Sequence, residues 1–123
     1  MGFLCPECKN KELEITSSIE IPPDTRSDEI TLQVLRCTRC GFKSLGLYEE
    51  SRRGNLREEY VNHKGIYIPE AELKDIELMI KKCPDPRNSK CICDSHRYFS
   101  VKAKGRWKCI ERLIYYNTFV LEF

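Results

Sequence analysis

Two short cysteine pairs of identical spacing constrain this chain more than any other feature. Cys5 and Cys8 form the first pair, and Cys37 and Cys40 form the second. Two residues between thiolates let one tight turn present both sulfurs to a single ion, and two such turns complete the tetrahedron that zinc prefers in closed structural sites. Gly41 follows the second pair, where a turn around the sulfurs often needs the positive φ that glycine adopts readily. We therefore predict a zinc ion held by these four cysteines.

The segment between the two pairs predicts a β-hairpin. Residues 12–21 and 29–36 are rich in β-branched residues, alternate in part between apolar and polar, and flank the polar turn PPDTRSD. Residues 42–48 can supply a third strand. The two CxxC motifs around this hairpin resemble a zinc ribbon, and the resemblance covers residues 3–48. It is specific for metal but says little about function, because ribbons serve many partners.

The tip of this hairpin resembles one family of ribbons more closely. The run TRSDEITLQVLRCTRCG is similar to the ribbon of transcription elongation factor S, in which an acidic dipeptide precedes the second CxxC. The resemblance implies that Asp28 and Glu29 would enter the active centre of RNA polymerase and help to position metal and water for transcript cleavage. This chain lacks one residue in the tip motif, has a longer first arm and carries the ribbon near its N-terminus. The alternative is that the tip residues are simply good turn formers.

A second group of metal-ligating residues follows the strongest helix prediction, residues 69–82. Pro69 stands in its first turn, apolar residues recur on one face, and acids precede lysines in the order that suits the helix dipole. The residues after this helix offer thiols and one imidazole, which can converge on one ion where the backbone turns sharply. We predict a second zinc site formed by Cys83, Cys91, Cys93 and His96, with Cys109 as an alternative ligand. In the alternative interpretation, some of these are buried, inert thiols.

The C-terminal third carries most of the excess positive charge. Between Pro86 and Arg112, eight basic residues stand against two acidic ones, with aromatic residues among them. A hairpin formed by RYFSVK and RWKCIERLIYY would place cations and rings on one sheet surface, where they could hold a nucleic acid. The candidate contacts are Arg97, Lys102, Lys104, Arg106, Trp107 and Lys108. Alternatively, the rings face the core and the lysines face water. The apolar C-terminal run YYNTFVLEF is expected to pair as a last strand.

Several other classes of protein are disfavoured by the sequence. The chain contains no apolar stretch long enough to span a membrane, and its start lacks the basic leader and apolar run of a signal peptide. We therefore expect a cytoplasmic protein with no membrane partner, in which paired CxxC motifs indicate metal rather than disulfides. The motif CPEC could also be a redox site, but strand-like residues follow it and a matching second pair is present.

Catalytic signatures are missing as well. The chain has no HExxH motif, no HxE followed by PCxxC, no phosphate-binding loop and no GxSxG elbow. His63 stands alone in VNHKG, and we expect it in a solvated loop. A zinc hydrolase is therefore the least favoured function for this chain.

Together these patterns predict a small α+β protein stabilised by zinc. We expect an N-terminal three-stranded antiparallel zinc ribbon, one amphipathic helix and a C-terminal β-hairpin unit with a second zinc knuckle, divided into residues 1–51 and 52–123. The preferred function is a non-catalytic interaction module, an adaptor or regulator that binds a protein partner. The alternative is a nucleic-acid-binding or RNA polymerase-associated transcription factor that uses the basic C-terminal unit and the Asp28/Glu29 tip.

Overall fold

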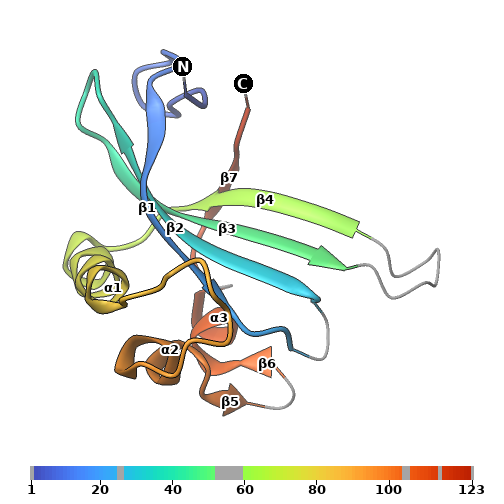
Figure 1. Cartoon of the computed structure of the whole chain (residues 1–123). Coiled ribbons are helices and arrows are strands. Elements are labelled where there is room, and N and C mark those ends of the chain that lie inside the picture. The colour runs from blue at the N-terminus through green and yellow to red at the C-terminus, as the bar shows by residue number, and fades with distance from the viewer. Residues whose placement is uncertain (1, 25–26, 52–59, 104–105, 114, 123) are drawn as a thin grey trace.

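The computed structural model describes residues 2–24, 27–51, 60–103, 106–113 and 115–122. Five antiparallel strands form a twisted sheet in the order β1-β2-β3-β4-β7 (Figure 1). The strands are β1 (Leu13–Ile21), β2 (Glu29–Cys37), β3 (Lys43–Ser51), β4 (Tyr60–Ile66) and β7 (Thr118–Val120). The first three strands confirm the predicted three-stranded antiparallel unit.

Alternation along the first three strands directs one set of side chains into the main core. In β2, Ile30, Leu32 and Val34 are buried on the face that also receives Leu45 and Leu47 of β3. These residues face one side because successive side chains of a strand point to opposite faces of the sheet. A register shift in β1 between residues 15 and 17 interrupts the β1–β2 pairing without ending the strand.

Two further strands extend the sheet beyond the predicted ribbon. β4 pairs with β3 over its whole length, so the expectation that His63 lies in a solvated loop is wrong. The free edge of β3 supplies backbone partners that a local sequence pattern cannot reveal. β7 pairs with residues 64–66 of β4, which confirms the predicted last strand.

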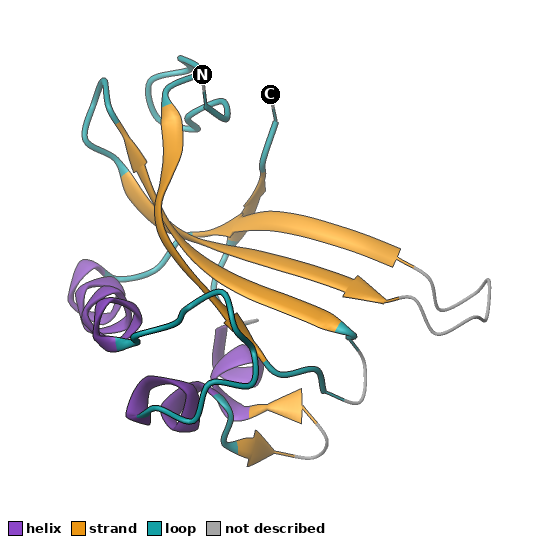
Figure 2. Cartoon of the chain, viewed as in Figure 1, coloured by secondary structure: helices purple, strands orange, loops and turns teal. Residues whose placement is uncertain are grey.

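The helices gather on one side of the sheet (Figure 2). They are α1 (Glu70–Lys82), α2 (Asp94–Phe99) and α3 (Lys108–Leu113). The first confirms the predicted amphipathic helix and buries Leu73, Ile76 and Ile80. The predicted C-terminal hairpin is present but short, because α2 and α3 occupy most of its expected arms and leave only β5 (Lys102–Ala103) and β6 (Arg106–Trp107) paired.

Two clusters of buried residues hold the fold together. The larger one joins the inner face of the sheet to all three helices and includes Phe99, Trp107 and Ile110. The smaller one contains Phe3, Leu13 and Leu35 with two buried cysteines, and the side chains of residues 119 and 121 pack against it. The sheet and the larger cluster both draw on residues from either side of the expected division at residue 51. Among the described helices, none combines the length and the apolar character needed to cross a membrane.

Candidate metal centres

The first four cysteines converge as their spacing predicts. Their Sγ atoms all lie within 4.8 Å of one another, with 3.7 Å between Cys5 and Cys40 and 3.6 Å between Cys8 and Cys37. A tetrahedral zinc site with metal–sulfur bonds near 2.3 Å has sulfur–sulfur edges of about 3.8 Å. All four cysteines are free rather than disulfide-bonded. The arrangement therefore fits a closed site for one zinc ion.

The backbone around this first centre turns in the way that the motif requires. Gly41 has a φ of 81° and donates its N–H to the carbonyl of Cys37 at 3.0 Å, which confirms the need for glycine here. The first turn reaches a positive φ of 63° at Lys9, whose N–H donates to the carbonyl of Cys5. The two knuckles are thus a pair of tight turns that present their sulfurs to a common point.

The electrostatics of the first centre call for a cation. Hydrogen bonds from Asn10 lower the pKa of Cys8 to about 6, so this thiol supplies a thiolate readily. At Cys40 a backbone hydrogen bond from Phe42 lowers the pKa, but desolvation and the neighbouring thiols raise it to about 12. Further thiolates beside the first are disfavoured unless a cation offsets their charge. A bound divalent ion would supply that charge.

The two ends of the chain meet at this centre. The N–H of Leu4 donates to the carbonyl of Glu122 at 2.6 Å, and Phe119 and Leu121 pack against the cluster that contains Cys5 and Cys37. The C-terminal segment therefore helps to bury the site, although Cys40 remains exposed. No sequence pattern predicts this contact, because it joins residues far apart in the chain.

The second group also converges, through Cys83, Cys91, Cys93 and His96. Their ligand atoms lie within 4.8 Å of one another. The Nδ1 atom of His96 is 3.3 Å from the sulfurs of both Cys83 and Cys93, and the sulfurs of Cys83 and Cys91 are 3.9 Å apart. Three thiolates and one imidazole form a donor set typical of structural zinc.

The histidine of the second centre is oriented by the sheet. Its Nε2 atom lies 2.8 Å from the carbonyl oxygen of Glu20 in β1, an acceptor that places the proton on Nε2 and leaves Nδ1 free for a metal. The N–H of Glu20 in turn donates to the carbonyl of Pro86 at 2.7 Å. The sequence did not indicate these contacts, since backbone groups carry no motif.

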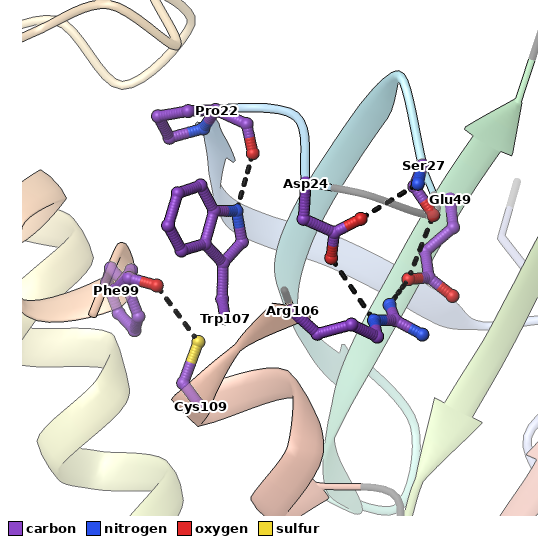
Figure 3. Close-up of polar contacts among 8 residues, drawn as sticks. All are labelled: Pro22, Asp24, Ser27, Glu49, Phe99, Arg106, Trp107 and Cys109. Atoms are coloured by element: carbon purple, nitrogen blue, oxygen red, sulfur yellow. Dashed lines mark hydrogen bonds and ion pairs between the residues drawn. The ribbon is translucent and has the colours of Figure 1, made fainter. Parts of the chain in front are cut away.

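The alternative ligand Cys109 points elsewhere. Its thiol donates to the carbonyl of Phe99 at 3.3 Å, and burial raises its pKa to about 12 (Figure 3). A neutral, hydrogen-bonded thiol behaves as a packing residue rather than a metal ligand.

Two of the six candidate nucleic-acid contacts are engaged inside the protein (Figure 3). Arg106 donates to Asp24 at 3.1 Å and to the carboxylate of Glu49, and its side chain is only 12% exposed. Trp107 is buried, and its indole N–H donates to the carbonyl of Pro22 at 2.6 Å. Sequence reasoning could not foresee these contacts, because the acidic partners lie more than fifty residues away.

The other candidate contacts differ in their surroundings. Arg97 and Lys108 are exposed on α2 and α3. The side chain of Lys102 and the whole of Lys104 lie outside the described part of the chain. Of the candidate contacts whose side chains the structure describes, the two exposed ones therefore lie on helices.

The acidic pair at the β1–β2 tip is split between two environments. Asp28 is exposed and donates its N–H to the carbonyl of Glu50, whereas Glu29 lies within β2, directly opposite Glu50. Burial raises the pKa of Glu29, and the carboxylates of Glu50 and Glu20 raise it further. These two residues therefore do not extend together from a free loop.

Comparisons with known protein families, with curated proteins and with solved structures gave no match. The class of the protein therefore rests on its own fold and sites. It is a small α+β protein with one cysteine cluster arranged like that of a zinc ribbon and a second cysteine and histidine group, each able to hold a metal ion.

Proposed function

We propose that this protein is a non-catalytic zinc-binding interaction module, in which two zinc ions serve structure rather than chemistry. The observation that carries the proposal is the closure of both groups, since four protein ligand atoms converge at each. Catalytic zinc sites usually keep one position open for water or substrate, and thiolate-rich sites are usually structural. A closed, sulfur-rich donor set therefore disfavours a zinc hydrolase.

The places of the two centres support a structural role. The first joins both chain ends to the sheet, and the second joins the end of α1 and the start of α2 to β1. A chain of this size buries a modest core, and metal sites contribute directly to its folding free energy. The remaining surface is then available for a protein partner, which makes an adaptor or regulator the proposed role.

Zinc content measured on the purified full chain tests this proposal. We expect two zinc ions per chain by elemental analysis, one in a Cys8→Ser variant and one in a Cys93→Ser variant, whereas Cys109→Ser keeps both. Chelation should lower the melting temperature of the wild-type protein. A single zinc in the wild-type chain would reject the second centre, and a chain that folds equally well without zinc would reject the structural role.

A nucleic-acid or RNA polymerase partner is the second candidate, and the exposed cations Arg97 and Lys108 favour it. Such binding should weaken steeply as salt is raised, because cations on the protein displace counterions from phosphates. Transcript cleavage by stalled RNA polymerase, lost in Asp28→Ala with Glu29→Ala, would support the resemblance to elongation factor S. Affinity capture from cells with and without nuclease distinguishes this candidate from a protein partner.

A further inference from the structure

A pocket of about 270 Å³ lies among β2, α1, α2 and α3, on the side of the sheet that carries the helices. Its apolar walls include Leu32, Ile76, Phe99 and Leu113. Two polar side chains in these walls already have partners. The thiol of Cys109 donates to a carbonyl, and the carboxylate of Glu72 accepts hydrogen bonds from Tyr116 and Arg112. The pocket therefore favours an apolar group, because apolar side chains make up most of its walls.

The margin of the pocket is cationic. Lys108 and Arg112 line it, and both are exposed on α3. Arg112 keeps a 64% exposed side chain although it pairs with Glu72 at 2.7 Å, and Lys108 forms no ion pair among the described residues. A ligand with negative charge beside its apolar part would thus meet complementary charge at the rim.

Exposed apolar side chains flank the same pocket. Tyr98 and Val101 both line it, and each is 50% exposed. The volume is just below the range of about 300–1,000 Å³ typical of sites for small ligands, whereas a cavity of about 150 Å³ already holds benzene. The pocket therefore fits one large apolar side chain, with Tyr98 and Val101 available to contact the residues on either side of it.

From these observations we infer that the pocket is the docking site for an acidic segment of a partner protein, which inserts one large apolar side chain between α1 and α3. The inference rests on the proposed interaction function and gives it a place and a partner chemistry. The second metal centre positions this site, because Cys93 begins α2 by accepting the N–H of His96, and the pocket residues Tyr98 and Phe99 follow within the same helix.

Peptide selection on the zinc-loaded full chain tests the inference. A displayed library of short random peptides is screened against the immobilised protein, and selected peptides are synthesised with a fluorophore for anisotropy titration. We expect the selected sequences to combine one Phe, Leu, Ile or Trp with several Asp or Glu residues. Replacing the apolar residue by Ser should weaken binding by about tenfold or more, which is the scale expected for burying one large apolar side chain.

Two protein variants with a matched control locate the site. Lys108→Glu reverses a charge at the rim and should weaken binding by about tenfold. Lys74→Glu makes the same change of net charge on an exposed position of α1 that lines a different groove, and it should leave binding unchanged. Val101→Trp should fill the mouth of the pocket with a larger side chain and so weaken peptide binding. Melting temperatures verify that each variant is folded.

Several results would overturn the inference. One is a set of selected peptides without a shared acidic and apolar pattern. Another is equal peptide binding by the Lys108→Glu and Lys74→Glu variants. A third is a set of NMR amide chemical-shift changes, caused by the peptide, that lie only on the opposite face of the sheet. Displacement of the peptide by a labelled single-stranded oligonucleotide, with steep salt dependence, would assign the surface to nucleic acid instead. Zinc is measured in every sample, so a protein that holds both ions but fails these tests rejects the docking site and leaves the structural role of zinc intact.

Discussion

His63 illustrates how the sheet changes the chemistry of a single residue. Its Nε2 atom donates to Oε1 of Gln33 at 2.6 Å across β3, and its ring contacts Phe3 and Tyr48 edge-on. Gly46 lies opposite Gln33 in β3, and a Cβ atom there would lie 2.7 Å from the Gln33 oxygen. The histidine is therefore part of the packed outer face of the sheet.

This environment makes His63 a source of pH-dependent stability. Burial lowers the pKa of His63 below its ordinary value of 6.5. The unfolded chain then binds more protons in the interval between the two pKa values, so the contribution is fully present above about pH 6.5 and is lost as the pH falls toward the folded-state pKa. We expect the advantage of the wild-type protein over His63→Gln to shrink below this pH. Urea unfolding of both zinc-loaded proteins over a pH series measures it, and parallel stability curves would contradict it.

Gly65 is a position where one methyl group should be costly. A Cβ atom there would lie 2.2 Å from the ring of Phe119, its cross-strand partner in β7. We expect Gly65→Ala to lower the free energy of unfolding by about 1–3 kcal/mol, the usual range for overpacking. The effect should be smaller in a Phe119→Leu background, which frees space over the glycine. Equal losses in both backgrounds, measured by urea unfolding, would argue against this packing.

At the scale of elements, Arg106 fastens the short C-terminal hairpin to the loop between β1 and β2. It bridges Asp24 and Glu49, and Ser27 reinforces both carboxylates through its N–H and hydroxyl (Figure 3). Burial lowers the pKa of Arg106, but the two carboxylates outweigh this and raise it. The guanidinium therefore stays charged and neutralises two buried carboxylates that would otherwise have no counter-charge.

Removing this cation should be among the most damaging single changes. We expect Arg106→Met to lower the free energy of unfolding by about 3–5 kcal/mol, because it leaves buried carboxylates without a counter-charge. Adding Asp24→Asn and Glu49→Gln should recover part of the loss. Arg97→Met, at an exposed position that forms an ion pair with Asp94, serves as the control and should change little. Urea unfolding at neutral pH provides the comparison. If Arg97→Met lowered the free energy of unfolding as much as Arg106→Met does, the proposed role of the Arg106 ion pairs would be refuted.

The elements that the sequence predicted are those set by local patterns. β-branched alternation and the CxxC turns define β1 to β3, and apolar periodicity with ordered charges defines α1. β4 and α2 escaped prediction for different physical reasons. β4 depends on the open edge of β3, and α2 begins where a metal-ligating sulfur, that of Cys93, accepts an N–H. The metal ligands could be predicted from their spacing. The ion pairs of Arg106 could not, because their acidic partners come from distant parts of the chain.

At the scale of the whole molecule, the two metal centres belong to different core clusters. The first lies in the small cluster beside both chain ends, and Cys83 of the second lies in the large cluster with the helices. The centres share no ligand and no described hydrogen bond. This separation implies that removing the metal from one site leaves the packing around the other site intact.

Metal loading should reverse the sign of the net charge. The chain has a formal charge of +2 with all cysteines neutral. A zinc ion held by four thiolates carries −2 and one held by three thiolates and an imidazole carries −1, so a chain with both ions has a net charge of about −1. On native electrophoresis at neutral pH, the zinc-loaded protein should migrate toward the anode, and the metal-free, reduced protein, whose charge lies between neutral and +2 depending on how many thiols ionise, should not.

Single-site variants turn this reversal into a measure of each centre. Cys109→Ser, which leaves all eight proposed ligands in place, should migrate like the wild-type protein. Cys93→Ser with only the first ion bound should remain near neutrality, because the positive charge of the metal-free chain is offset by one four-thiolate centre. Loaded protein that migrates no further toward the anode than metal-free protein would mean that the sites do not bind zinc through deprotonated thiols. The experiment thus tests the ligand chemistry itself, since zinc bound by neutral groups would shift the migration toward the cathode.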